Sequence, residues 1–203
     1  MNYISRNLEK VVTEVTKEYP VVLVTGPRQV GKTTMLQKLM EGTSRSYVSL
    51  DDLNERSIAK NDPELFLQLH KPPVLIDEVQ YAPELFTYIK IYVDRNHNPG
   101  DFWLTGSQVF KLMRGVQESL AGRVAVLSLT SLSQAEICNG KMEPFTVDIE
   151  ALLTRAKERK PADAREIFDR IFKGSMPAIV SGKNSNSQIF YSSYLTTYIE
   201  RDV

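Results

Sequence analysis

The chain has 203 residues, enough for one sizeable α/β core and a small appendage. Lys and Arg together equal Asp and Glu at 25 each, so no overall charge attracts nucleic acid or an acidic membrane, although composition leaves a local basic patch open. The single cysteine, Cys138, excludes an internal disulfide and suits a reducing cytoplasm. The charged N-terminal residues do not resemble a signal peptide, and no apolar run reaches the length of about 18 residues that a membrane span needs.

Short apolar strands alternate with helices over the first 130 residues. An amphipathic helix is predicted over residues 3–19, and Pro20 ends it. Strands are predicted at residues 21–25, 46–50, 73–76, 102–104 and 124–129. Helices are predicted at residues 32–40 and 109–120, and others start at Asp62 and Pro83. This alternation predicts a parallel α/β sheet of about five strands flanked by helices, with right-handed crossovers.

The pattern changes after about residue 131, where the strands stop. Ser133 and Glu136 have the spacing of a capping box at a helix start. Further helices are predicted at residues 148–159, 163–173 and 187–202. We therefore expect an α/β core with an N-terminal helix at residues 1–130 and a small, lid-like helical subdomain at residues 131–203.

A glycine-bounded loop between the first strand and the next helix fits the pattern G-x-x-x-x-G-K-[ST]. It comprises Gly26, Pro27, Arg28, Gln29, Val30, Gly31, Lys32 and Thr33, with Thr34 directly after it. The backbone amides of such a loop, and of the helix start behind it, point at a phosphate. Lys32 is placed to neutralise the β- and γ-phosphates of ATP, Thr33 offers its hydroxyl to Mg²⁺, and Thr34 is a weaker candidate for the α-phosphate. The strand–loop–helix context favours this interpretation over a chance match in a turn.

Two acidic residues end the third strand. In a phosphate-loop fold the first, Asp77, would hold the Mg²⁺ shell, usually through water. The second, Glu78, would orient or deprotonate the attacking water. The alternative is that the pair only caps the following segment.

Further candidates for catalysis are two residues at the end of the fourth strand and two arginines. Ser107, with Thr105 as second choice, ends the fourth strand and is predicted to contact the γ-phosphate or the water; a polar turn is the alternative. Arg123 begins the fifth strand, at the edge opposite the phosphates, so it would act only on a neighbouring subunit's nucleotide. Arg114 is the rival for that role, and a local ion pair is the alternative for Arg123.

These motifs together resemble the AAA-type ATPases of bacteria and archaea. The resemblance rests on residues 26–34, 50–52, 75–80, 104–108 and 118–123 and on the tail segments 174–177 and 198–203. It implies an additional-strand P-loop fold with strand order 5-1-4-3-2, with Lys32, Thr33, Asp77 and Glu78 in the roles above. It also implies a further C-terminal domain, often nuclease-like, and the absence of a helix stop before Val203 agrees with more chain following.

The leading hypothesis is a cytoplasmic, Mg²⁺-dependent ATPase that couples hydrolysis to a conformational change in a partner or attached domain. The alternative is a non-hydrolysing nucleotide-gated switch or scaffold, against which an intact Glu78 argues. A kinase is disfavoured because no Arg-rich lid is found, and a GTPase because no N-K-x-D motif occurs. The target stays open: homo-oligomerisation is compatible with the sequence, nucleic acid is not indicated by charge, and no membrane is expected.

Overall fold

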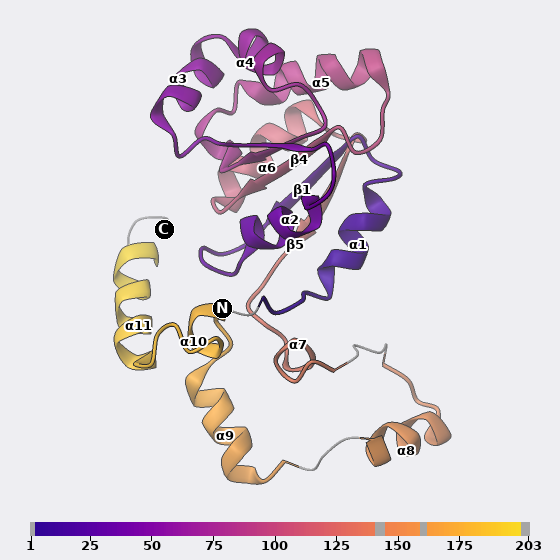
Figure 1. Ribbon diagram of the computed structural model, residues 1–203, viewed down its shortest axis with the longest axis vertical. Helices are drawn as coiled ribbons and strands as arrows, with labels where there is room; N and C mark the ends of the chain where they lie inside the picture. The colour runs from indigo at the N-terminus through magenta and orange to yellow at the C-terminus, as the bar shows by residue number, and fades with distance from the viewer. Residues whose placement is uncertain (1–2, 141–144, 159–161, 200–203) are drawn as a thin grey trace. The chain divides into compact units, whose positions relative to one another are not determined.

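The computed structural model describes residues 3–140, 145–158 and 162–199. Within them the chain forms two compact units: residues 6–130 make one, and residues 131–199 with residues 3–5 make the other. Figure 1 shows the sheet in the first unit, while the second is drawn from short helices and connecting segments.

A five-stranded sheet is the centre of the first unit. Its strands are β1 (Val21–Thr25), β2 (Ser46–Ser49), β3 (Val74–Asp77), β4 (Phe102–Gly106) and β5 (Val124–Ser128). They lie in the order β2-β3-β4-β1-β5 and every neighbouring pair is parallel. Read in reverse, this is the expected order 5-1-4-3-2. Because all strands run the same way, the residues that follow β1, β3 and β4 reach the same edge of the sheet.

Helices cover both faces of this sheet. They are α1 (Leu8–Val15), α2 (Lys32–Met40), α3 (Leu53–Asn61), α4 (Pro63–Leu69), α5 (Leu85–Asn96) and α6 (Val109–Ser119), with a 3₁₀ turn η1 (Val79–Tyr81) after β3. Figure 1 shows α1 and α2 on one side of the sheet and α5 and α6 on the other. Alternate strand residues serve the two faces: Val21 and Leu23 join the core that includes Phe86 and Ile89 of α5, whereas Val22 and Val24, equally buried, lie outside that cluster.

The first helix is shorter than predicted. We expected residues 3–19, but α1 spans only Leu8–Val15. The segment before it is held by Arg6, whose guanidinium donates to the carbonyls of Val30 and Thr130, each at 2.7 Å. Those long-range hydrogen bonds fix Arg6 against the loops that follow β1 and β5, so helical periodicity in the preceding residues does not decide their conformation.

The second unit is helical in its described part. Its elements are α7 (Gln134–Ile137), α8 (Ile149–Glu158), α9 (Ala164–Lys173), α10 (Pro177–Val180), α11 (Ser187–Tyr194) and the π-helical η2 (Leu195–Ile199). The predicted capping box is present: Ser133 Oγ accepts from the Glu136 amide at 3.2 Å, and Glu136 Oε2 accepts from the Ser133 amide at 2.7 Å. The helix predicted over residues 187–202 changes to π-helical winding at Leu195, and residues 200–203 lie outside the described part.

Candidate nucleotide-binding site

The loop between β1 and α2 has an unusual backbone. Gly26, Gln29 and Gly31 have φ angles of 142°, 62° and 94°. A Cβ on Gly26 would lie 2.0 Å from the carbonyl oxygen of Leu129, so glycine is required there by close approach as well as by φ. Gly31 caps α2 in the left-handed region and leaves the first amides of that helix facing the loop. This is the arrangement in which a helix N-terminus receives a phosphate.

Lys32 is buried at the start of α2, with 5% of its surface exposed. Its Nζ donates to the carbonyls of Gly26 at 2.9 Å and Pro27 at 2.8 Å. Burial lowers the pKa of Lys32, while Glu78 and Asp77 act to raise it and Arg28 to lower it. Both direct partners are neutral carbonyls. An anionic phosphate in the loop would therefore supply the negative charge that is missing beside this ammonium.

The other loop residues have distinct surroundings. Val30 is buried and its carbonyl accepts from Arg6, whereas Pro27 and Gln29 are exposed. Thr34, the weaker candidate, has an exposed side chain on α2. The structure therefore ties the loop to the N-terminal segment through Arg6, a residue for which the sequence offered no functional signal.

Asp77 is held at the end of β3 by three hydroxyl groups. Thr33 Oγ1 donates to Asp77 Oδ1 at 2.8 Å, and Thr105 Oγ1 donates to the same oxygen. Tyr47, on the neighbouring strand β2, donates to Asp77 Oδ2 at 3.2 Å. Asp77 is 6% exposed, so these donors replace the water that a carboxylate otherwise needs. The two residues predicted to hold a metal are thus in direct contact.

The pair Thr33 and Asp77 suits Mg²⁺. Both offer oxygen ligands, which this ion prefers, and it commonly binds one or two protein oxygens while keeping water and substrate phosphate as other ligands. No group of three or more His, Cys, Asp or Glu side chains with metal-binding geometry occurs within the described ranges. The described residues therefore do not form a metal site made only of carboxylates or imidazoles.

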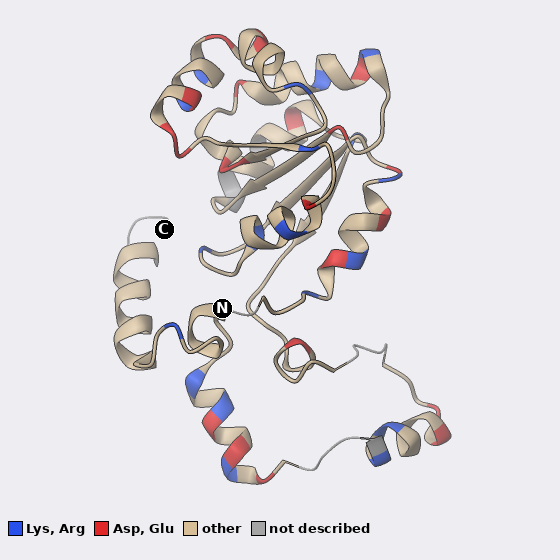
Figure 2. Cartoon of the chain, in the orientation of Figure 1, with Lys and Arg blue, Asp and Glu red and all other residues tan. Residues whose placement is uncertain are grey.

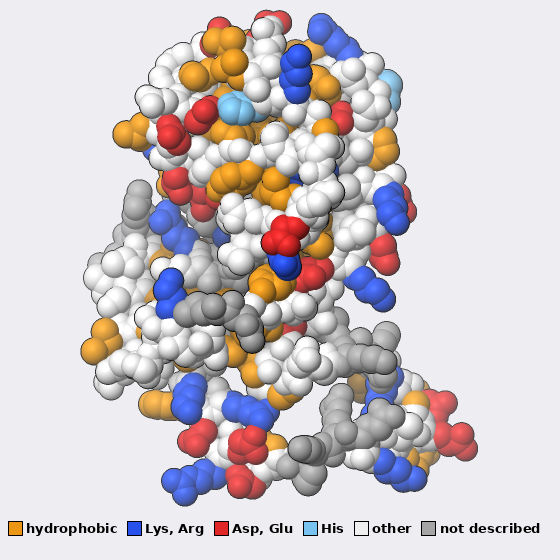
Figure 3. All heavy atoms as spheres, viewed as in Figure 1, with side chains coloured by type: hydrophobic (Ala, Val, Ile, Leu, Met, Phe, Trp, Pro, Cys, Tyr) orange, Lys and Arg blue, Asp and Glu red, His pale blue; other side chains and the backbone are white. Residues whose placement is uncertain are grey.

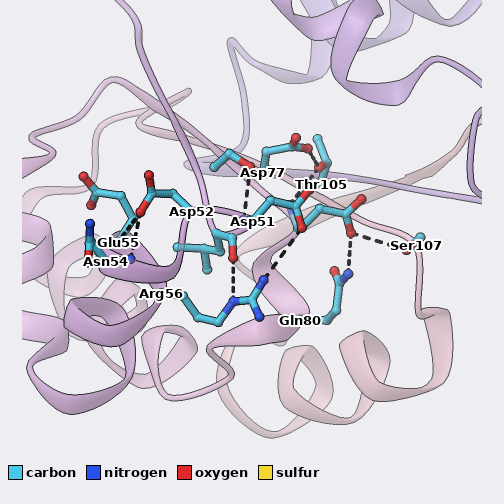
Figure 4. A network of polar contacts seen from close by, with 12 residues as sticks. Asp51, Asp52, Asn54, Glu55, Arg56, Asp77, Gln80, Thr105 and Ser107 are labelled. Carbon is cyan, nitrogen blue, oxygen red and sulfur yellow. Dashed lines mark hydrogen bonds and ion pairs between the residues drawn. The ribbon is translucent and has the colours of Figure 1, made fainter.

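Glu78 follows in a strained conformation, and its neighbours Gln80, Thr105 and Ser107 are labelled in Figure 4. The φ of 56° and ψ of 44° of Glu78 lie in the left-handed region, which costs a non-glycine residue about 1–3 kcal/mol. The Glu78 amide donates to Thr105 Oγ1 at 3.2 Å, and Glu78 Oε2 accepts from Ser107 Oγ at 3.3 Å and from Gln80 Nε2. Side chains from the ends of β3 and β4 therefore fix both the backbone and the carboxylate of Glu78.

The remaining candidates lie elsewhere or have other partners. Arg123 forms a two-point ion pair with Asp94 of α5, with Nε–Oδ1 at 2.5 Å and Nη2–Oδ2 at 3.0 Å. It lies at the start of β5, where its carbonyl accepts from Val21, and so at the edge opposite Asp77. The side chain of Arg114, on α6, lies outside the described residues. Asp52, which lies in the segment 50–52 that contributes to the resemblance, caps α3 by accepting from the amides of residues 54 and 55.

Sequence reasoning missed two contributors to the site. Gln80 lies in the segment 75–80 that contributes to the resemblance, but the sequence predicts no role for it. The sequence predicts Tyr47 only as part of a strand. Tyr47 could have been found from strand order, since only the pairing of β2 with β3 brings its hydroxyl to Asp77. Thr105, our second choice, contacts both acidic residues, whereas Ser107 contacts Glu78.

Known proteins resemble this chain in sequence. A family model described as an AAA domain matches residues 18–138, more than half of the chain. Uncharacterized proteins of Mycobacterium bovis and Mycobacterium tuberculosis are each 30% identical over 187 residues, covering 91% of this chain and 36% of theirs. The chain thus spans about a third of the length of these curated relatives.

Solved structures resemble the chain in fold. A Walker-type ATPase of Pyrococcus abyssi matches with a TM-score of 0.55 at 16% identity, covering 96% of this chain and 72% of the other. The AMPPCP-bound DnaA of Aquifex aeolicus matches with a TM-score of 0.52 at 16% identity, covering 96% and 64%. At such identity the likeness shows the P-loop nucleoside triphosphatase fold and nothing finer. Of the helices described, none has the length and apolar character needed to cross a bilayer.

Proposed function

Because the chain belongs to the AAA domain family, we propose that it binds ATP with Mg²⁺ and hydrolyses the bond to the terminal phosphate. The observation that carries this proposal is the assembly of Lys32, the Thr33–Asp77 contact and the restrained Glu78 at one edge of the sheet. Fold likeness alone would not separate a hydrolase from a nucleotide-gated scaffold. The presence of an acid at position 78, with its carboxylate held by two donors, favours hydrolysis.

Each residue then has a defined task. The loop amides and Lys32 would bind the β- and γ-phosphates. Thr33 and Asp77 would hold Mg²⁺, which would neutralise charge on the phosphate oxygens. Glu78 accepts a proton from water as the water oxygen bonds to the γ-phosphorus. The bond from that phosphorus to the β–γ bridging oxygen breaks, and ADP and phosphate leave. Ser107, which donates to Glu78, is the proposed contact to the water or the γ-phosphate.

A partner or attached domain would use the energy of this reaction. The relatives are about three times as long as the matched region, which supports a coupled domain in the same, longer chain. We also propose that the protein is cytoplasmic and forms a homo-oligomer. Figure 2 shows acidic and basic residues interspersed along elements such as α1 and α9, and the face drawn in Figure 3 likewise carries both signs. Neither view favours a nucleic-acid partner, which would be met by a basic patch.

The test is Glu78→Gln, which keeps the size of the side chain and removes its charge. We expect ATP·Mg²⁺ to bind with little change while turnover falls by about 10²–10⁴-fold, the usual contribution of a general base. Phosphate release with ATP and with GTP, beside calorimetric binding, measures both properties. Glu84→Gln, an exposed acid-to-amide change at the start of α5, is the matched control. A wild-type chain that binds ATP without releasing phosphate would instead establish the nucleotide-gated switch.

A further inference from the structure

Gln80 is a buried polar residue beside the site whose side chain the reaction described above does not use. It lies in the 3₁₀ turn η1 directly after β3, with 7% of its surface exposed. Its Nε2 donates to Glu78 Oε2, and its Oε1 is buried with no hydrogen-bond partner. An apolar side chain of similar length would fill the same space without burying an unpaired acceptor. The benefit of glutamine at this position must therefore lie in the hydrogen bond to Glu78.

The two donors to Glu78 meet on a single oxygen. Gln80 Nε2 and Ser107 Oγ both donate to Glu78 Oε2, and dashed lines mark the two hydrogen bonds at the labelled Gln80 and Ser107 in Figure 4. Gln80 follows β3 and Ser107 follows β4. Among the described residues no hydrogen bond is made to the other oxygen, Oε1. Two donors on one oxygen fix the rotation of the carboxylate and leave Oε1 as the oxygen available to a water molecule.

The lack of a side chain at Gly106 leaves space for the Gln80 amide group. A Cβ built on Gly106, the last residue of β4, would lie 2.4 Å from Gln80 Oε1 and 2.3 Å from a methyl carbon of Leu112. Glycine at position 106 thus leaves the space in which the side-chain amide of Gln80 packs, between η1 and the end of β4. The contact with Glu78 depends on this close approach as well as on the amide itself.

From these contacts we propose that Gln80 is a positioning residue for hydrolysis, which orients Glu78 so that Oε1 receives the proton of the attacking water. The proposal rests on the proposed function of Glu78 as the base. Gln80 acts on Glu78 and not on ATP, so its loss affects turnover rather than nucleotide affinity. Misplacing a catalytic group by about 1 Å can cost on the order of 10²-fold in rate.

The main test is Gln80→Met, which keeps the length of the side chain and removes the donor. We expect kcat to fall by about 10- to 100-fold, with the affinity for ATP·Mg²⁺ unchanged within about twofold. Gly106→Ala, which displaces the amide from outside, should lower kcat in the same direction. Val93→Ala, a cavity in the core at α5, controls for general destabilisation, and Gln117→Met makes the same chemical change on an exposed helix position. Both controls should retain wild-type kcat.

A double-mutant comparison separates positioning from a structural role. If Gln80 acts through Glu78, single-turnover rates of Glu78→Gln and Glu78→Gln/Gln80→Met should be equal, because no carboxylate remains to be oriented. A purely structural lesion would slow both backgrounds alike. Turnover of Gln80→Met within about twofold of wild type, or equal slowing in both backgrounds, would overturn the proposal.

One measurement does not depend on turnover. The side-chain amide protons of Gln80, observed by NMR, should exchange slowly with solvent in the wild type and faster in Glu78→Ala. Unchanged exchange would refute the contact even in a chain that hydrolyses nothing. Conversely, if the wild type had no ATPase activity but the Gln80 amide still exchanged faster in Glu78→Ala, Glu78 would not be the base, while the Gln80–Glu78 pairing would be established.

Discussion

Lys32 is a buried ammonium whose direct hydrogen-bond partners carry no negative charge. Its ammonium bonds to the carbonyls of Gly26 and Pro27, which compensate for lost water but carry no net charge. A bound phosphate would add full negative charge within reach of the same group, in surroundings from which water is largely excluded. The conformation seen here is thus prepared for an anion, and its affinity should depend on the charge of Lys32.

Replacing Lys32 by alanine should therefore abolish tight ATP binding without unfolding the chain. The remaining loop amides would still face the ligand, but the partner of the β- and γ-phosphates would be gone. Calorimetry measures the affinity, and circular dichroism checks the fold. Lys38→Ala removes an exposed lysine, paired with Glu41, from the same helix and should bind ATP normally. Unchanged affinity in a folded Lys32→Ala chain would place the nucleotide elsewhere.

The lowered pKa of Lys32 gives a further prediction at the same residue. Burial pulls this pKa below the ordinary 10.5, so in the free protein Lys32 loses its proton at a lower pH than an exposed lysine does. Because only the protonated form attracts phosphate, ATP affinity should decline as pH rises through that lowered value. Titrations from neutral pH up to the ordinary value of 10.5 measure this decline, and Lys32→Arg, which keeps its charge, should flatten it. A flat profile in the wild type would contradict this reading.

Among the elements, strand β4 carries features at both of its ends. Its carboxyl end supplies Thr105 and Ser107 to the site, while Asp101 precedes its start at the opposite edge. Asp101 is 8% exposed, and its Oδ2 is buried with no hydrogen-bond partner. Burial raises the pKa of Asp101, with Asn98 and Arg45 acting in the other direction. The charged form of this carboxyl is therefore disfavoured in the folded state.

The sign of that shift predicts how stability depends on pH. An acid whose pKa is raised on folding stabilises the protein below its unfolded value, and this contribution is lost as pH rises through the folded value. Asp101→Asn cannot ionise, so at pH 7 it should melt at a higher temperature than the wild type, and the difference should shrink toward pH 4. Thermal melts across that range test this, with exposed Asp169→Asn as control. A difference independent of pH would exclude ionisation as the cause.

At the scale of the whole molecule, Arg123 bears on assembly. Within one chain it is paired with Asp94 at the sheet edge opposite Lys32, so a role in hydrolysis would require a neighbouring subunit. An arginine supplied in that way contributes about 10³–10⁵-fold to rate. The resemblance to AAA-type ATPases motivates the proposal that Arg123 acts on a neighbouring subunit's nucleotide. Because Arg123 lies at the opposite edge of its own sheet, the test must combine two different chains.

Mixing two inactive variants supplies that test. Lys32→Ala chains carry Arg123 but bind no nucleotide, whereas Arg123→Ala chains bind nucleotide but lack the arginine. We expect the mixture to recover ATPase activity that neither variant shows alone. Asp94→Ala frees Arg123 from its partner and should retain activity, which separates loss of the ion pair from loss of the arginine. No recovery at any ratio, with monomers in sedimentation under ATP, would exclude the role in trans.

Local patterns predicted much of the fold. The phosphate loop, the pair Asp77 and Glu78 and the alternation of strands with helices follow from residues close together in the chain, because turn chemistry, helix capping and side-chain periodicity act over a few residues. The resemblance supplied the strand order. The length of the first helix was less well predicted. The segment around Arg6 has helical periodicity, yet long-range hydrogen bonds hold it outside α1.

Only the tertiary structure decided which groups surround the two acids. Tyr47 and Thr105 lie 30 and 28 residues from Asp77 in sequence, and they meet it because β2 and β4 are the two strands that flank β3 in the sheet. Gln80 lies two residues from Glu78, but it reaches the carboxylate because Glu78 adopts a left-handed conformation and Gly106 leaves space for the amide. The sequence by itself determined the phosphate loop and its strand–helix frame. Contacts between strand ends depend on register and close approach, which no local pattern encodes, so the partners of Asp77 and Glu78 were decided by the fold.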